Sequence, residues 1–294
     1  MKMPDMIPSE IQESIALMLF PAPFSVRRST PLSGGCINQA YRVDTEDNSY
    51  FIKFNHAGLY PGMFEAEVRG LEVLEKTNTL RVPRPILAST AGRYTYIIME
   101  FIGTGKSHSS FWEDFGMKLA RLHRNTASSY GLDHDNYIGS LPQSNRFHDS
   151  WTDFFITERL EPQLKQAADS GAAGAPLLRQ FEKLYRLLPS LIPQEPPALI
   201  HGDLWNGNYM TAPDGSACLI DPAVHYGHRE ADLAMSLLFG GFSESFYDAY
   251  QGAYPLESGW KERMDIHKLY PLLVHVNLFG GGYIRFVASI VSTF

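Results

Sequence analysis

The first third of the chain shows strand-like and helical patterns of apolar residues. Two runs, around 39–43 and 50–54, contain β-branched and aromatic residues and flank the polar turn DTEDN, which predicts a β-hairpin. In the segment FEAEVRGLEVLEKT, Val68, Leu71 and Leu74 recur at helical spacing, with charged residues on the other face. This spacing predicts an amphipathic helix of about three turns.

The pattern changes near residue 111. Residues 93–102 are apolar and predict a buried strand, and the small polar segment GTGKSHSS that follows marks a boundary. Beyond it most segments have helical periodicity, interrupted by the short strand-and-loop units PPALIHGDLWNGN and GSACLIDPA. We therefore expect an α+β fold with a β-rich N-terminal lobe, residues 1–103, and a mainly helical C-terminal lobe, residues 104–294.

Composition excludes several classes of protein. No apolar run approaches the roughly 20 residues that a membrane span needs. The net charge is −7 and there is no block of Lys or Arg, which argues against a nucleic-acid or anionic-membrane partner. The N-terminus lacks the pattern of a secretory signal, and two cysteines are too few for a disulfide framework, so we expect a cytoplasmic protein with reduced thiols.

An acid and an amide stand close together in the stretch HGDLWNGN. Asp203 precedes Asn208 by five residues, and a second acid, Asp221, ends the apolar run ACLID downstream. Asn208 and Asp221 offer the hard oxygen ligands that Mg²⁺ prefers. Asp203 is then left to accept the proton of a substrate hydroxyl, as a general base.

Residues upstream of this stretch add to the same chemistry. Gly34 and Gly35 let a backbone approach phosphate closely, because no Cβ intervenes. Lys53 brings a positive charge to the non-transferred phosphates if Glu67 holds it, through an ion pair that we expect to be partly exposed. In this order the residues predict ATP-dependent phosphoryl transfer, in which catalysis is mainly positioning and electrostatic stabilisation.

The motifs resemble those of the fructosamine (ketosamine-3) kinases, a branch of the aminoglycoside- and choline-kinase-like small-molecule kinases. HGDLWNGN and IDPAVHYGHREADLAM carry the resemblance, and SGGCINQAY, MFEAEVRGLEVL, VPRPI, IIMEFI, LARLHR and YGLDHDNYIGSLPQSN are similar to family blocks. These blocks run from about residue 33 to 235. The pattern HGD-x-x-x-x-N alone indicates only the kinase superfamily, whereas Trp205 and DPAVHYGHRE are more specific to this branch.

The resemblance implies a two-lobed protein-kinase-like fold with ATP and Mg²⁺ bound between the lobes. By position, Lys53 and Glu67 match the lobe-bridging ion pair, Asp203 the catalytic Asp, and Asn208 and Asp221 the metal ligands. The adenine would lie against the connecting segment of Met99, Glu100, Phe101 and Ile102. The sequence DPA replaces the Phe-Gly pair of protein kinases, so switching by a flip of that segment is not implied.

The resemblance also implies a reaction. It predicts an ATP-dependent phosphotransferase that acts on the O3 hydroxyl of ketosamines, the fructosamine or ribulosamine adducts of amines or protein lysines, in deglycation repair. One alternative is a kinase for another small alcohol, of the aminoglycoside or choline type. A second is a catalytically dead nucleotide-binding scaffold.

Several other residues have both a functional and a structural interpretation. His201 is expected to brace the loop rather than transfer protons. Asp232 either holds the catalytic loop or is a helix N-terminal acid. His123 is expected to be a satisfied core histidine. Trp205 and His225 either line the sugar pocket or pack between segments.

The two cysteines differ in context. Cys36 follows SGG directly, so it is either a small apolar loop residue or a redox-reactive thiol in the loop over the ATP phosphates, next to Gly34 and Gly35. The protein is then a monomer or a redox-linked dimer. Cys218, in the strand that leads to Asp221, is expected to be buried and inert.

Overall fold

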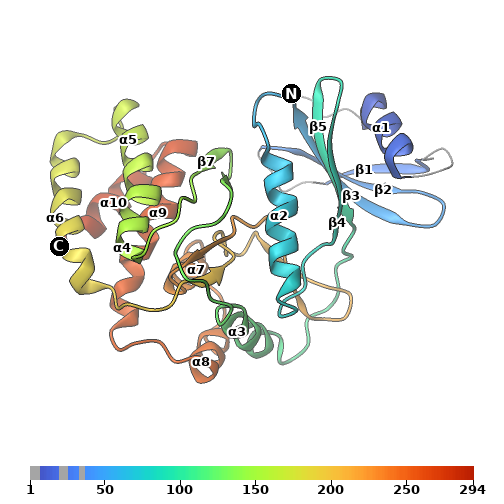
Figure 1. Cartoon of the computed structure of the whole chain (residues 1–294). Coiled ribbons are helices and arrows are strands. Elements are labelled where there is room, and N and C mark those ends of the chain that lie inside the picture. The colour runs from blue at the N-terminus through green and yellow to red at the C-terminus, as the bar shows by residue number, and fades with distance from the viewer. Residues whose placement is uncertain (1–6, 20–25, 33–36) are drawn as a thin grey trace. The chain divides into compact units, whose positions relative to one another are not determined.

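The chain packs into two compact units. A computed structural model describes residues 7–19, 26–32 and 37–294 (Figure 1). The first unit spans Met1–Ser109 with Met210–Ile220, and the second spans Ser110–Tyr209 with Asp221–Phe294. The division falls six residues beyond the predicted boundary at 103/104, and the first unit takes in an additional segment from the predicted C-terminal lobe.

A five-stranded antiparallel sheet forms the frame of the first unit. Its order is β1-β2-β3-β5-β4, and the strands are Arg28–Leu32 (β1), Gln39–Asp44 (β2), Ser49–His56 (β3), Pro85–Ala91 (β4) and Tyr94–Glu100 (β5). The predicted hairpin is confirmed, because β2 pairs with β3 from Gln39↔Phe54 to Asp44↔Ser49. The predicted strand over 93–102 is confirmed as β5.

A helix covers each face of this sheet. Helix α1 (Ser9–Leu19) buries Ile11 and Ile15 against Ile52, Phe54 and other strand residues. Helix α2 (Met63–Lys76) is the predicted amphipathic helix, and its Glu67 contacts Lys53 on β3. Since neighbouring residues of a strand point to opposite faces, Lys53 lies on the face opposite to that of Ile52 and Phe54.

The segment 210–220 belongs to the first unit because it pairs with that unit's backbone. Strands β9 (Tyr209–Thr211) and β10 (Ala217–Leu219) form a two-stranded sheet. The Leu219 amide donates to the Arg81 carbonyl, and the Gly105 amide donates to the Thr211 carbonyl, each at 2.9 Å. These bonds join residues more than a hundred positions apart, which local periodicity does not reveal.

The second unit is mainly helical, as predicted. Its helices are Phe111–Leu122 (α3), Trp151–Phe154 (α4), Glu161–Asp169 (α5), Ala175–Leu191 (α6), Glu230–Ser236 (α7), Glu244–Ala253 (α8), Trp260–Phe279 (α9) and Tyr283–Val291 (α10). A π-helical turn, Phe155–Leu160, joins α4 to α5. The second unit also contains two short pairs of antiparallel strands: Asn136–Ile138 (β6) with Leu141–Gln143 (β7), and Ala198–Ile200 (β8) with His225–Gly227 (β11). In the described part of the chain no helix has the length and apolar character needed to cross a membrane.

Helices α3 and α8 approach each other at a glycine. A Cβ atom built on Gly116 of α3 would lie 2.2 Å from the carbonyl oxygen of Phe246 in α8. That oxygen belongs to a rigid helical backbone and cannot turn aside. The contact therefore requires glycine at position 116.

We predict that Gly116→Ala lowers the free energy of unfolding by at least about 1–3 kcal/mol, because overpacking forces the two helices apart. Gly252→Ala is a matched control in α8, since a Cβ there meets nothing within 4 Å. It should be neutral or stabilising by up to about 1 kcal/mol, as for a helical glycine replaced without strain. Chemical denaturation measures both, and equal stabilities for the two variants would contradict the packing assigned to Gly116.

Candidate active site

The loop between β8 and β9 brings the predicted acid and amide together. The Asn208 side-chain amide donates to the Asp203 carboxylate at 2.7 Å and to the Asp203 carbonyl at 2.9 Å. The backbone N–H of Asp203 donates to Nδ1 of His201, which is buried, at 3.3 Å. This contact agrees with the bracing role predicted for His201.

The loop makes a sharp turn that only glycine permits. Gly202 has φ +81°, in the left-handed region, and a Cβ atom there would lie 2.1 Å from the Ala223 carbonyl oxygen. Both the conformation and the close backbone approach therefore exclude other residues. The turn places the Asp203 side chain immediately after the buried strand β8.

Asp232 anchors the start of this loop. Its carboxylate, 1% exposed, accepts hydrogen bonds from the backbone N–H groups of His201 at 2.7 Å and Gly202 at 2.8 Å. His123 lies 3.2 Å from the same carboxylate through Nε2 and 2.8 Å from the Tyr250 hydroxyl through Nδ1. Of the two interpretations of Asp232, the contacts support the one in which it holds the loop, and they confirm that His123 is a satisfied core histidine.

Asp232, on α7, and Asp203, on the loop, have opposite pKa shifts. Burial opposes the ionisation of Asp232, but its hydrogen bonds and the nearby His123 and His201 hold its pKa below the usual value. Burial raises the pKa of Asp203 to about 7 against the effect of the Asn208 hydrogen bond, and the charges of Asp221 and Asp232 add to the rise. By surface area, Asp203 is half-buried.

Asp221 follows β10 and begins the return of the chain into the second unit. It is exposed and has φ +53°, a left-handed conformation that aspartate tolerates better than most residues. Its charge acts on Asp203, which places the two carboxylates in one electrostatic neighbourhood. Asp203, Asn208 and Asp221 all belong to the second unit, and the metal-binding role of Asn208 and Asp221 stays a prediction.

The lysine and glutamate predicted to pair do so within the first unit. Lys53 Nζ lies 2.7 Å from Glu67 Oε1, and the two side chains are 9% and 11% exposed. The expectation of a partly exposed pair is therefore wrong, because the sheet and α2 enclose it. Breaking a buried pair costs more than breaking an exposed one, since the remaining charge loses its partner.

The segment predicted to meet adenine lies at the end of β5. Met99 and Ile102 are buried, Glu100 accepts a hydrogen bond from Arg81 at 2.8 Å, and Phe101 lies under the Arg42 guanidinium at 4.6 Å. Its role toward adenine stays a prediction.

The predicted phosphate loop, with Gly34, Gly35 and Cys36, lies outside the described residues. The role of Cys36 as a redox thiol, and the dimer linked through it, stay predictions. Cys218 is confirmed as buried, and burial raises the pKa of its thiol to about 12, which keeps it protonated.

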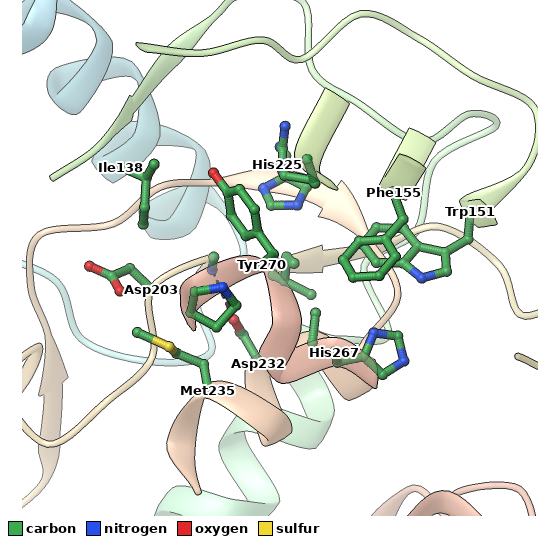
Figure 2. A pocket seen from close by; sticks show the side chains of 14 residues that line it. Ile138, Trp151, Phe155, Asp203, His225, Asp232, Met235, His267 and Tyr270 are labelled. Atoms are coloured by element: carbon green, nitrogen blue, oxygen red, sulfur yellow. Dashed lines mark hydrogen bonds between the residues drawn. The ribbon is translucent and has the colours of Figure 1, made fainter. Parts of the chain in front are cut away.

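A pocket opens beside Asp203 within the second unit. Figure 2 shows Asp203 on one side of it and Trp151 and Phe155 on the other, with Tyr270 and His225 between. The β8–β11 pairing sets His225 opposite Ile200, next to the start of the loop that carries Asp203. Trp205 is not among the pocket's lining residues; it is half-buried and contacts the Phe239 ring. Of the two substrate candidates, only His225 lines this pocket.

Trp151, Phe155 and Arg159 also line the pocket, and sequence reasoning missed them. The periodicity of their segment, SWTDFFITERLEPQL, predicts only a helix. Their spacing of four residues was the available signal, because it sets all three on one side of a helical segment.

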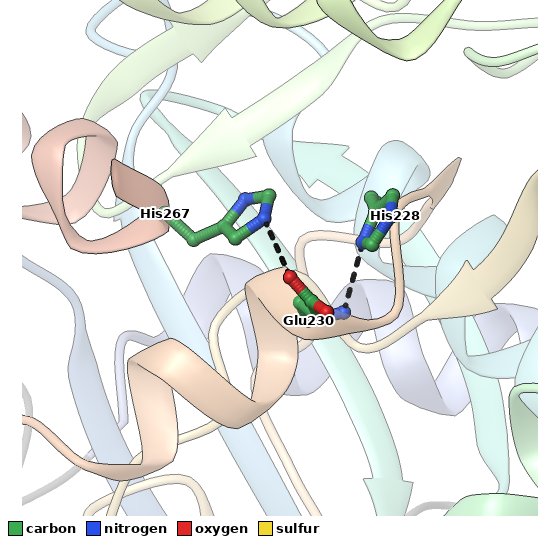
Figure 3. A group of neighbouring side chains, drawn as sticks. All are labelled: His228, Glu230 and His267. Atoms are coloured by element: carbon green, nitrogen blue, oxygen red, sulfur yellow. Dashed lines mark hydrogen bonds and ion pairs between the residues drawn. The ribbon is translucent and has the colours of Figure 1, made fainter. Parts of the chain in front are cut away.

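A second group of buried residues has the composition of a metal site. Ligand atoms of His228, Glu230 and His267 lie within 4.8 Å of one another (Figure 3). However, Arg263 binds both carboxylate oxygens of Glu230, with Nε at 3.2 and 3.0 Å. His228 accepts from the Glu230 backbone N–H at 3.3 Å and donates to the Pro193 carbonyl at 3.2 Å. These partners occupy the ligand atoms of His228 and Glu230, and His267 Nε2 lies 3.3 Å from the Glu230 carboxylate, so we interpret the group as a structural network.

Comparisons with known proteins agree with one another. The sequence model described as "Fructosamine kinase" matches residues 9–294. A "Probable ketoamine kinase" of Enterococcus faecium is 41% identical over 90% of this chain and 94% of its own length. "Protein-ribulosamine 3-kinase, chloroplastic" of Arabidopsis thaliana is 40% identical over 90% and 81%.

Solved structures give the same result for the fold. The crystal structure of a protein named "Putative fructosamine-3-kinase" from Haemophilus somnus superposes with a TM-score of 0.85 at 29% identity, covering 96% of both chains. An aminoglycoside phosphotransferase solved with AMP-PNP and hygromycin B has a TM-score of 0.64 at 14% identity, over 97% of this chain and 99% of its own. The second likeness shows the fold alone, and the predicted protein-kinase-like α+β fold is confirmed.

The raised pKa of Asp203 predicts a pH-dependent stability in the absence of metal and nucleotide. A carboxyl whose folded-state pKa of about 7 exceeds its unfolded value near 4 stabilises the fold below pH 4 and loses that contribution as pH rises to 7. Asp203→Asn should therefore gain melting temperature relative to wild type between about pH 4 and pH 7, with no further gain above.

Asp265→Asn serves as the matched control, because Asp265 is 59% exposed beside Lys268. Its melting temperature should follow that of wild type over the same range. A constant offset between Asp203→Asn and wild type from pH 4 to 8 would show that Asp203 has an ordinary pKa.

Proposed function

The chain belongs to the fructosamine kinase family, and we propose that it transfers the γ-phosphoryl group of ATP to the O3 hydroxyl of a ketosamine. One observation carries the assignment of roles. Asp203 and Asn208 are joined by a 2.7 Å hydrogen bond on a loop whose first two N–H groups are fixed by Asp232. This is the arrangement that a positioned base and a metal ligand require.

In this proposal Asp203 is the general base. The acceptor hydroxyl gives its proton to the Asp203 carboxylate while its oxygen forms a bond to the γ-phosphorus, and the bond from that phosphorus to ADP breaks. A pKa of about 7 suits this role, because the carboxylate is then basic enough to hold the proton and still ionised in part at neutral pH.

The polar groups beside Asp203 fit a magnesium ion. Both contacts of the Asn208 side-chain nitrogen go to Asp203, which leaves its Oδ1 as the ligand atom. Asp221 adds an exposed carboxylate in a region where carboxylates already raise the pKa of Asp203. A bound Mg²⁺ would offset this crowded negative charge and that of the phosphates.

Groups of the first unit complete the proposed roles. Lys53, held by Glu67 at 2.7 Å, supplies a fixed positive charge for the non-transferred phosphates. Gly34, Gly35 and Cys36 would cover the phosphates, and the segment from Met99 to Ile102 would meet the adenine. Phosphorylation at O3 makes the adduct labile, so the proposed role is deglycation repair in the cytoplasm.

The two alternatives predict different outcomes in one assay. We propose to measure ATP consumption with ribulose-, erythrulose- and fructose-lysine, and with an aminoglycoside and choline. Turnover with a ketosamine supports the proposal. Turnover only with another alcohol favours a different small-molecule kinase, and binding of Mg-ATP without any turnover favours a scaffold.

The assigned roles make separable predictions for two acids. Asp203→Asn should keep Mg-ATP affinity and lower kcat by about 10²–10⁴-fold, because it removes the base but not the nucleotide ligands. Asp221→Ala should instead weaken metal-dependent nucleotide binding. Titration calorimetry and phosphate-transfer rates measure the two effects, with Asp265→Asn as the surface control. Near-full activity of Asp203→Asn would refute its role.

A further inference from the structure

Three residues that line the pocket beside Asp203 carry buried nitrogen atoms without a hydrogen-bond partner. These atoms are Trp151 Nε1, Arg159 Nε and His267 Nδ1. The three side chains belong to residues that are 5%, 1% and 2% exposed. Buried polar groups normally have partners, because leaving one unpaired costs about 1–3 kcal/mol. Three such atoms belong to residues that line one pocket, and from this we infer that the pocket receives a polar ligand.

Arg159 is the most unusual of the three. Its terminal nitrogens donate to the carbonyl oxygen of Ser144 at 2.5 Å and to Asn145 Oδ1 at 2.6 Å, and the guanidinium lies 4.5 Å from the Phe154 ring centre. Among the described residues no carboxylate lies within ion-pair distance of it. Burial lowers the pKa of Arg159 to about 10, which still leaves it charged at neutral pH.

The backbone that carries Arg159 is itself unusual. Phe155–Leu160 is a π-helical turn, a rare conformation that occurs frequently at functional sites. It follows the single α-helical turn that begins at Trp151. Trp151, Phe155 and Arg159 all line the pocket, so this wall is built from one irregular helical segment.

The chemistry of the pocket suits hydroxyl groups. Trp151 Nε1 and Arg159 Nε are donors only. His225 donates from Nδ1 to the Ala223 carbonyl at 3.0 Å, and burial with the nearby Arg159 charge keeps its pKa well below the usual value, so its Nε2 is an acceptor. A hydroxyl group both accepts and donates. Arg159 has no direct ion pair among the described residues, and its positive charge disfavours a cationic group beside it, such as the amine of a ketosamine.

We propose that this pocket binds the hydroxylated carbon chain of the acceptor beyond the phosphorylated hydroxyl, and that Arg159 and Trp151 select it by donating hydrogen bonds. The inference rests on the proposed function and deepens it. The sugar end then enters the pocket beside Asp203, and the amine end points away from Arg159. This pocket therefore does not discriminate between ketosamines by the size of the group attached to the amine.

The first part of the test changes the substrate and leaves the protein intact. The wild-type protein is assayed with ribuloselysine and with two analogues, one lacking the hydroxyl at carbon 4 and one lacking the hydroxyl at carbon 5. At least one analogue should lose about 10–100-fold in kcat/KM, the usual effect of removing a hydrogen bond to a charged group. Equal kcat/KM for all three substrates would overturn the proposal.

The second part tests whether the N–H groups of Trp151 and Arg159 donate hydrogen bonds to that hydroxyl. Trp151→Phe keeps the ring and removes the N–H, and Arg159→Lys keeps the charge and removes Nε–H. In these variants the loss on the deoxy analogue should shrink to a few fold, while Trp112→Phe, at a tryptophan outside the pocket, keeps full discrimination. A merely structural role would slow both substrates equally.

The outcomes separate this inference from the proposed function. If wild type phosphorylates ribuloselysine but discrimination is the same in Trp151→Phe and wild type, the inference fails and the function stands. If wild type phosphorylates no ketosamine, the proposed function fails first. Should Arg159→Lys not fold, the Trp151→Phe pair and the substrate series still decide the question.

Discussion

The buried carboxylate of Asp232 is the contact on which the candidate site depends. It accepts the backbone N–H groups of His201 and Gly202, at the point where β8 turns into the loop that carries Asp203. Two directed hydrogen bonds to a buried, ionised group are stronger than neutral ones and hold both position and direction. His123 and Tyr250 extend the network to α3 and α8, so the loop is tied to the helical frame of the second unit.

Asp232 on α7 and Asp203 on the loop have the same side chain in different surroundings. Asp232 is surrounded by donors, which stabilise its charge. Asp203 has the Asn208 amide as its partner and lies near two other acids, so its charge is held in a less favourable environment. Environments that push the pKa values of two acids apart are typical of sites for acid–base chemistry. The pocket that opens from Asp203 continues this arrangement with unpaired donors at Trp151 and Arg159.

Local pattern was sufficient for much of the fold and for the identity of the loop residues. The hairpin of β2 and β3, helix α2 and strand β5 follow from apolar spacing, and the pairing of Lys53 with Glu67 follows from the order of the motifs. Local sequence pattern could not predict the contacts between residues that are distant in the sequence. The bonds of residues 210–220 to Arg81 and Gly105, and the enclosure of the Lys53 pair, depend on tertiary packing that no window of sequence contains. The π-helical turn was hidden because its residues have ordinary helical periodicity.

We propose that Asp232 supports catalysis by positioning Asp203, and a double-mutant cycle in phosphate transfer measures this coupling. Residues that act as a unit are non-additive, since the second substitution removes what the first has already lost. Asp232→Asn and Asp203→Asn should each lower kcat, and the double variant should be no slower than the slower single variant. Losses that multiply in the double variant would show instead that the two carboxylates act independently and that Asp232 does not position Asp203.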